Sequence, residues 1–126
     1  MTDIAKKKIL IVDDEPTVIK LLSKLLNERY AVIKARNGEE AIKITASLHP
    51  DLILMDLMMP KMDGYQCCHV IKSDPKTSMI PVVMLTAVNQ SLNVKLGEIM
   101  GADGYITKPF DTKELLDTID KVIAGG

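Results

Sequence analysis

Five short apolar runs, separated by stretches long enough for a helix, constrain the fold of this chain more than any other feature. Most of the runs do not alternate apolar with polar residues, which is typical of parallel strands covered by helices on both faces. Such an alternation of strands and helices predicts an open α/β sheet rather than a β-sandwich. The runs are Ile9 to Val12, Ala31 to Ala35, Leu52 to Asp56, Val82 to Leu85 and Tyr105 to Thr107.

The stretches between the runs carry the signals of helix boundaries. Pro16 suits a first helical turn, and apolar residues follow it at helical spacing. Asn37 occupies a capping position, with Glu40 three residues later. Asp111 and Glu114 repeat that spacing near the C-terminus. Two further helices are predicted around Tyr65 to Lys72, after an Asp-Gly turn, and around Ser91 to Met100.

The order of elements predicts a doubly wound, flavodoxin-like α/β fold with five parallel strands and five helices. Right-handed crossovers place helices on both faces of the sheet, and the common five-stranded version has strand order 2-1-3-4-5. With 126 residues and no Pro-rich or Gly/Ser-rich linker, we expect one domain over residues 1–126, with its core at about 8–123.

Composition and charge exclude several classes of protein. Sixteen basic and seventeen acidic residues give a formal net charge of −1, so direct nucleic-acid or membrane binding is not expected. No apolar run approaches the length of a membrane span. Cys67 and Cys68 are adjacent, which suits free, packed thiols, and His49 and His69 have no metal-ligand company. We therefore expect a cytoplasmic protein.

Polar residues follow four of the predicted strands. Asp13 and Asp14 follow the first strand and Asp56 ends the third, while Thr86 and Lys108 come at the ends of the fourth and fifth. In a doubly wound sheet the carboxyl ends of the strands meet at one edge, where the strand order reverses. We therefore expect these side chains to gather in one crevice.

The chemistry of that crevice predicts a metal-dependent phosphoryl site. Three carboxylates held close together repel one another, which is costly unless a cation or a proton offsets the charge. All-oxygen ligands favour Mg²⁺ first and Mn²⁺ second. Lys108 and Thr86 could hold phosphoryl oxygens, and Asp56 could itself be the nucleophile. Considered singly, each residue fits a simpler role as a turn, cap, strand or surface residue. Their expected convergence favours the functional interpretation.

From Lys8 to about Ile123 the sequence resembles the receiver domains of two-component response regulators. A single acidic pair would be a weak signal, whereas four ordered segments are highly specific. The segments that carry the resemblance run from Ile9 to Pro16, from Asp51 to Gly64, from Pro81 to Ala87 and from Gly101 to Phe110.

The resemblance implies a role for each site residue. Asp56 matches the phosphorylated aspartate. Thr86 matches the switch hydroxyl and Lys108 the lysine that pairs with the phosphate. The other positions implied are Asp13 and Asp14 as the Mg²⁺-binding acids, Met58 as a backbone carbonyl ligand, Tyr105 as the aromatic switch and Pro109 after a cis peptide bond.

The resemblance also implies partners and a mechanism. A sensor histidine kinase or a phosphotransfer protein would be the donor, and phosphorylation would reshape the fourth helix, fifth strand and fifth helix to engage an effector or form a homodimer. Such a domain catalyses only its own phosphorylation and dephosphorylation. Because Met58 and Val88 are apolar and orient no water, we expect a comparatively long-lived phosphate.

Two other classes compete with this interpretation. A phosphohydrolase with an aspartyl nucleophile would carry a second acid two positions after Asp56, where this chain has Met58. A nucleotide- or flavin-binding module would carry a Gly- or Ser/Thr-rich phosphate loop after the first strand. There the chain has Asp13-Asp14-Glu15-Pro16, which would repel phosphate in the absence of a metal.

Overall fold

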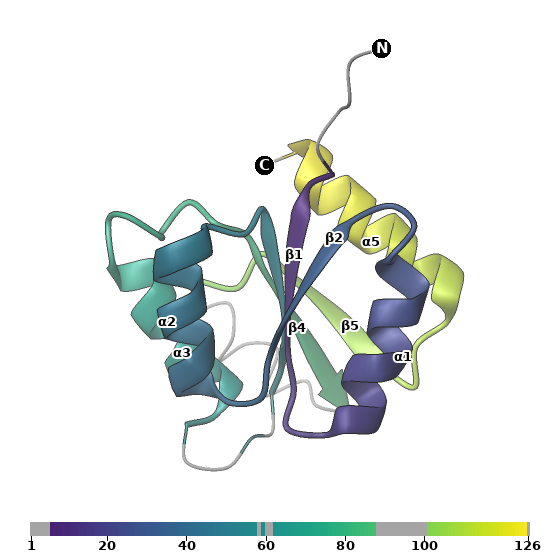
Figure 1. The fold of residues 1–126 in the computed structure, drawn as a ribbon, viewed down its shortest axis with the longest axis horizontal. Coiled ribbons are helices and arrows are strands. Elements are labelled where there is room, and N and C mark those ends of the chain that lie inside the picture. Colours follow the sequence, from purple (N-terminus) through teal and green to yellow (C-terminus); the bar gives the residue numbers. More distant parts are fainter. Residues whose placement is uncertain (1–5, 58, 60–61, 88–100, 126) are drawn as a thin grey trace.

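The computed structural model describes residues 6–57, 59, 62–87 and 101–125, and strands alternate with helices up to residue 87 (Figure 1). The helix predicted around residues 91–100 lies outside the described residues. In chain order the elements are β1 (Lys8–Val12), α1 (Pro16–Leu26), β2 (Ala31–Ala35), α2 (Gly38–Leu48), β3 (Leu52–Asp56), α3 (Gly64–Ser73), β4 (Val82–Ala87), β5 (Gly104–Lys108) and α5 (Thr112–Gly125).

The five strands form one parallel sheet with the predicted order β2-β1-β3-β4-β5. Each predicted run falls within a strand, and the strand bounds differ from the runs by at most two residues at either end. The order reverses beside β1, because the chain runs outward from β1 to β2 and then returns to β3 on the other side. The doubly wound architecture is confirmed.

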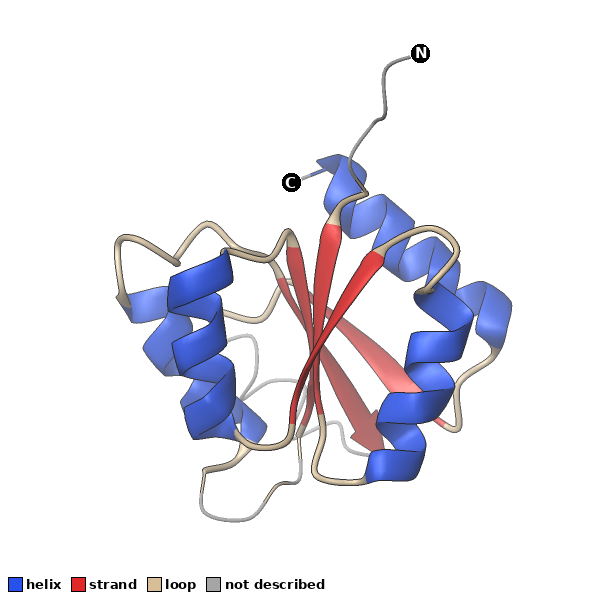
Figure 2. Ribbon diagram, in the orientation of Figure 1, coloured by secondary structure: helices blue, strands red, loops and turns tan. Residues whose placement is uncertain are grey.

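Helices cover both faces of the sheet (Figures 1 and 2). Helices α1 and α5 lie on one face, and α2 and α3 lie on the other. Along β1, Leu10 and Val12 join the apolar cluster beneath α2 and α3, whereas Ile9 and Ile11 join the cluster beneath α1 and α5. Two apolar clusters therefore explain why the central strands lack polar alternation.

The edge strands differ from the central ones. All five residues of β3 are buried, whereas β2 and β5 each contain one buried residue. Edge strands meet a neighbour on one side alone, so their side chains reach solvent more easily. Among the described residues, no helix has both the length and the hydrophobicity needed to cross a bilayer.

Side-chain caps fix the starts of α2, α3 and α5, whereas α1 begins at Pro16 without one. The Asn37 side chain accepts a hydrogen bond from the Glu40 amide at 2.8 Å, as the spacing predicts. Asp111 accepts one from the Lys113 amide at 3.1 Å before α5. Asp63, interpreted from sequence as part of a turn, also caps: it forms a capping box with Gln66 at the start of α3.

Candidate functional site

The carboxyl ends of the strands gather the predicted site residues at one edge of the sheet. Asp13 directly follows β1, and Asp56 is the last residue of β3. Thr86 and Lys108 lie at the ends of β4 and β5, where the two strands pair in register. Hydrogen-bonded pairing of β1 with β3 and of β3 with β4 places the same ends side by side. The predicted convergence is therefore present in the fold.

Three carboxylates form the centre of this edge. Asp13, Asp14 and Asp56 each offer one oxygen, and these oxygens all lie within 4.8 Å of one another. Asp13 is fully buried and Asp56 is 6% exposed, whereas Asp14 is exposed to solvent. The cluster is thus a partly buried acidic group with one side open to water.

The surroundings of Asp13 leave its charge incompletely compensated. One carboxylate oxygen, Oδ1, accepts a hydrogen bond from the Glu15 amide at 2.9 Å. The other, Oδ2, is buried and accepts no hydrogen bond. Burial, together with the nearby charges of Asp56 and Asp14, raises the Asp13 pKa from 3.8 to about 6, although the Glu15 amide and Lys108 act in the opposite direction. A bound cation would offset the negative charge of Asp13.

Lys108 supplies the positive charge of the site. Its Nζ lies 3.0 Å from Asp56 Oδ1 and 3.7 Å from Asp13 Oδ2. Burial alone would lower the pKa of Lys108, but the hydrogen bond and charge of Asp56 outweigh it, and the net pKa is raised. The ammonium therefore stays charged at neutral pH. The predicted cis peptide bond between Lys108 and Pro109 is present.

Gly64 holds the chain close to Asp56, a role that sequence reasoning missed. A β-carbon placed on Gly64 would lie 2.6 Å from the carbonyl oxygen of Asp56 and 3.0 Å from the Leu57 α-carbon. The Gly64 amide also donates to the Leu57 carbonyl at 2.9 Å. A residue without a side chain is therefore required where α3 begins against the end of β3. The Asp63-Gly64 pair was the available sequence signal for this close approach.

The two predicted switch residues lie on neighbouring strands. Thr86 is 2% exposed and pairs with Thr107 across β4 and β5. Tyr105 is half-buried, faces Met84 in the strand register and packs against the cluster beneath α2 and α3. Their placement is compatible with a switch, which stays a prediction. Met58 and Val88 lie outside the described residues. Their expected effect on the lifetime of the phosphate therefore stays a prediction.

The remaining candidates stand apart from the carboxylate cluster. Cys67 and Cys68 are buried free thiols, and burial raises their pKa values to about 12 and about 11, so both stay protonated and unreactive at neutral pH. His49 and His69 are exposed, at the end of α2 and on α3. The packing role expected of the thiols and the surface role expected of the histidines both agree with these positions.

Comparisons with known proteins agree with this geometry. The family model for the response regulator receiver domain matches residues 9–120. Protein PilH from Pseudomonas aeruginosa is 40% identical over 119 residues, which cover 94% of this chain and 98% of PilH. The probable transcriptional regulator ycf27 from Porphyridium aerugineum is 44% identical over 119 residues, again 94% of this chain. The match covers 48% of ycf27, so the chain spans about half the length of that relative.

Solved structures extend the agreement to three dimensions. A putative response regulator from Chloroflexus aurantiacus superimposes with a TM-score of 0.91 at 34% identity, covering 94% of this chain and 98% of that one. Sequence match, strand order and the arrangement of strand ends thus lead to one conclusion. The chain belongs to the response regulator receiver domain family.

Proposed function

We propose that the chain accepts a phosphoryl group on Asp56 from a sensor histidine kinase or a phosphotransfer protein, in a reaction that requires Mg²⁺. One observation carries the proposal. The Asp56 carboxylate lies beside those of Asp13 and Asp14, within 4.8 Å, and its Oδ1 lies 3.0 Å from the Lys108 ammonium. A carboxylate in this company can act as a nucleophile toward phosphorus while its charge is controlled.

The residues present fit a divalent cation. Asp13, Asp14 and Asp56 would hold it, together with the backbone carbonyl of residue 58 that the family resemblance implies. The donors are all oxygens, and Asp13 Oδ2 is a buried acceptor without a hydrogen bond, which suits Mg²⁺ and, as a second choice, Mn²⁺. When bound, the cation would offset negative charge on the phosphoryl oxygens during transfer.

In the proposed transfer, one bond forms at phosphorus as another breaks. An Asp56 carboxylate oxygen attacks phosphorus, a P–O bond forms, and the P–N bond of the donor phosphohistidine breaks with its electron pair returning to the imidazole nitrogen. Lys108 holds its ammonium against the acceptor carboxylate and pairs with the phosphoryl oxygens. The Thr86 hydroxyl, at the end of the neighbouring strand, donates to another of these oxygens.

The output would follow from the change of charge at Asp56. Movement of Thr86 toward the phosphate would let Tyr105 turn inward and alter the surface formed by the predicted fourth helix, β5 and α5. That surface would engage an effector domain or protein, or a second copy of the chain. We place the protein in the cytoplasm, where it would catalyse only its own phosphorylation and dephosphorylation. The longer relative ycf27 is named as a transcriptional regulator, which is compatible with an effector beyond this segment.

Intact mass after incubation with a small acyl phosphate tests the proposal. The wild-type chain should gain one phosphoryl group when Mg²⁺ is present and none when it is chelated, and hydroxylamine should release the group. Asp56→Asn should gain none. The matched control is Asp51→Asn at the opposite end of β3. The Asp51 side chain accepts a hydrogen bond from the Lys8 amide, and an asparagine side chain can accept the same hydrogen bond. Phosphorylation of Asp56→Asn, or equal uptake without Mg²⁺, would refute the proposal.

A further inference from the structure

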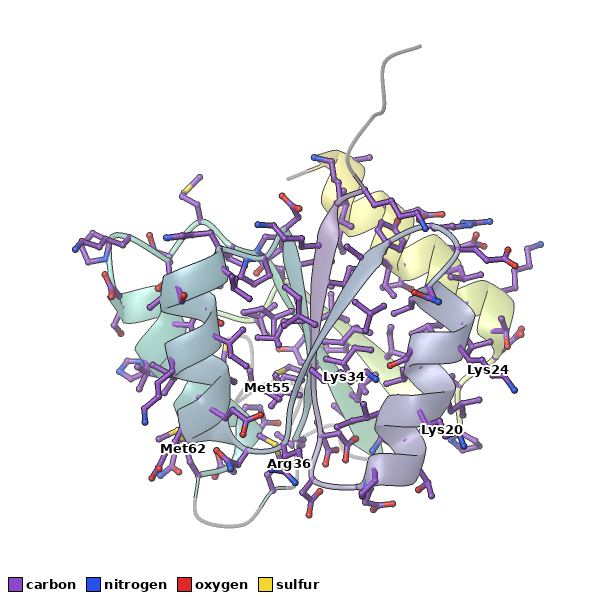
Figure 3. All side chains as sticks on the ribbon, viewed as in Figure 1. Lys20, Lys24, Lys34, Arg36, Met55 and Met62 are labelled. Atoms are coloured by element: carbon purple, nitrogen blue, oxygen red, sulfur yellow. The ribbon has the colours of Figure 1, made fainter. Side chains whose placement is uncertain are left out.

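A basic groove lies between α1 and β2, on the edge of the sheet opposite to β5. Two adjoining hollows of about 550 and 330 Å³ form it and share Lys20 and Lys34 in their linings. Lys20 and Lys24 come from α1, while Lys34 lies on β2 and Arg36 directly follows that strand (Figure 3). We call this surface the α1–β2 groove.

The charge of the groove is one-sided. Lys20, Lys24, Lys34 and Arg36 are all exposed, and none of them forms an ion pair with another described residue. The one carboxylate among the lining residues, Glu40, accepts a hydrogen bond from the Arg36 amide at 3.3 Å. In a chain whose formal net charge is −1, four unpaired cations along one groove form a local positive surplus.

The floor of the groove is apolar. Ile19 is buried at 6% exposure, Val32 is half-buried, and both belong to the packing beneath α1 and α5. Pro16 closes one end where α1 begins. Cations along the rim and aliphatic side chains below favour a partner that carries both acidic and apolar side chains over a polyanion such as nucleic acid.

The edge of the sheet adds backbone groups to the same groove. The Ala31 amide donates inward to the Lys7 carbonyl at 2.9 Å, so alternation along a parallel strand turns the amides and carbonyls of Val32 and Lys34 outward. In the part of the chain that the structure describes, no strand pairs with that side of β2. An extended segment could therefore add to the sheet here.

We propose that the α1–β2 groove binds an extended acidic peptide segment of a partner protein, which pairs with the outer edge of β2. Alternate carboxylates of the segment lie on the same face of the sheet as Lys34 and meet Lys20, Lys34 and Arg36. The apolar side chains between them lie on the opposite face, beside Ile33. Binding at this surface does not depend on phosphorylation of Asp56, so it can be tested independently of the phosphoryl transfer proposed above.

The test is a titration of the ¹⁵N-labelled full chain with a blocked peptide of alternating glutamate and valine. We expect amide shifts at Val32 and Lys34, slower hydrogen exchange of these two amides, and weaker binding at high salt. The double variant Lys20→Glu/Lys34→Glu should bind about tenfold more weakly, since two attractive pairs become repulsive. Exposed Lys76→Glu, outside the groove, should bind like the wild type.

Several results would overturn the proposal. These are no shift at millimolar peptide, shifts centred away from β2, unchanged exchange at Val32 and Lys34, or equal affinity of the double variant and the wild type. Stronger binding of a glutamine–valine peptide, of a DNA duplex or of anionic vesicles at the same residues would also contradict it. The amide spectrum of the double variant without peptide should keep the dispersion of the wild type, because Lys20 and Lys34 are exposed, and this folding control does not depend on phosphoryl transfer.

Discussion

Two lysine–aspartate pairs lie at different places in this molecule, and their surroundings differ. Lys72 on α3 contacts Asp103 at 2.7 Å and also donates to the carbonyls of Ile80 at 2.7 Å and Ser78 at 3.3 Å. The Asp103 carboxylate in turn accepts a hydrogen bond from the Val82 amide at 2.8 Å. One ammonium meets one carboxylate, and the donors of Lys72 are all used.

At the carboxylate cluster the balance is different. Lys108 is one ammonium among three carboxylates, and Asp13 Oδ2 is buried without a hydrogen bond. The first pair is complete and ties the segment after α3 to the start of β5. The second arrangement is incomplete and is suited to a cation or a phosphoryl group. The comparison teaches that charge balance and hydrogen-bond satisfaction, together with the burial of the carboxylates, separate a structural ion pair from a site.

Removal of the complete pair should have the largest effect on stability. Lys72→Met leaves Asp103 without its partner and two backbone carbonyls without their donor, so we expect a loss of about 3 kcal/mol in the free energy of unfolding. Phosphate uptake by the folded fraction should be retained. Urea unfolding measures the loss, with exposed Lys76→Met as the control. A change below about 1 kcal/mol would show that the pair contributes little.

Removal of a charge from the incomplete site should raise the stability of the metal-free chain, in contrast to Lys72→Met. Asp13 has a pKa of about 6 in the folded chain against 3.8 ordinarily, so folding binds protons between these pH values. The metal-free chain therefore loses stability as pH rises through this range, and the loss persists above it. Asp13→Asn removes the buried charge and should stabilise the metal-free chain by about 2 kcal/mol at neutral pH.

Thermal or urea unfolding of Asp13→Asn in the presence of a chelator checks this second prediction. Asp117→Asn on the exposed side of α5 is the matched control and should change little. Mg²⁺ should stabilise the wild type and not Asp13→Asn. The account would be wrong about Asp13 if the variant were less stable than the wild type without metal, or if Mg²⁺ stabilised both equally.

The pH dependence of Mg²⁺ affinity gives the smallest expected effect. A cation needs the ionised form of Asp13, so protons compete with it below the raised pKa of about 6. We expect a dissociation constant about tenfold weaker at about pH 5 than at about pH 7.5, measured by calorimetry. Identical constants at the two pH values would mean that Asp13 is not a ligand or that its pKa is not raised.

The sequence predicted the fold well because its signals are local. Apolar runs such as Leu52 to Asp56 predict strands that are covered on both faces, and Asn37 with Glu40 predicts the start of a helix. The convergence of the site followed from topology, since parallel strands bring their carboxyl ends to one edge. The capping role of Asp63 was missed, because an Asp-Gly pair suits both a turn and the start of a helix.

Other features could not be predicted from the sequence because they depend on tertiary contacts. Nothing in the sequence around Lys72 or Asp103 indicates that these residues pair across the fold. The adjacent residues Asp13 and Asp14 look alike in sequence, yet one is fully buried and the other is exposed. Burial is the largest cause of the raised pKa of Asp13, and that burial depends on the tertiary fold.

The most direct test of the account is an amide NMR titration of the chain with Mg²⁺ and beryllofluoride, a mimic of the phosphoryl group. We predict large shifts at Asp56, Thr86 and Lys108 that require both additions, while the amide of Lys72 in the complete pair stays in place. Asp56→Asn should abolish the response. Unchanged amides at Asp56 and Thr86 with both additions present, or the same shifts in Asp56→Asn, would contradict the claim that this carboxylate cluster is a metal-dependent phosphoacceptor site.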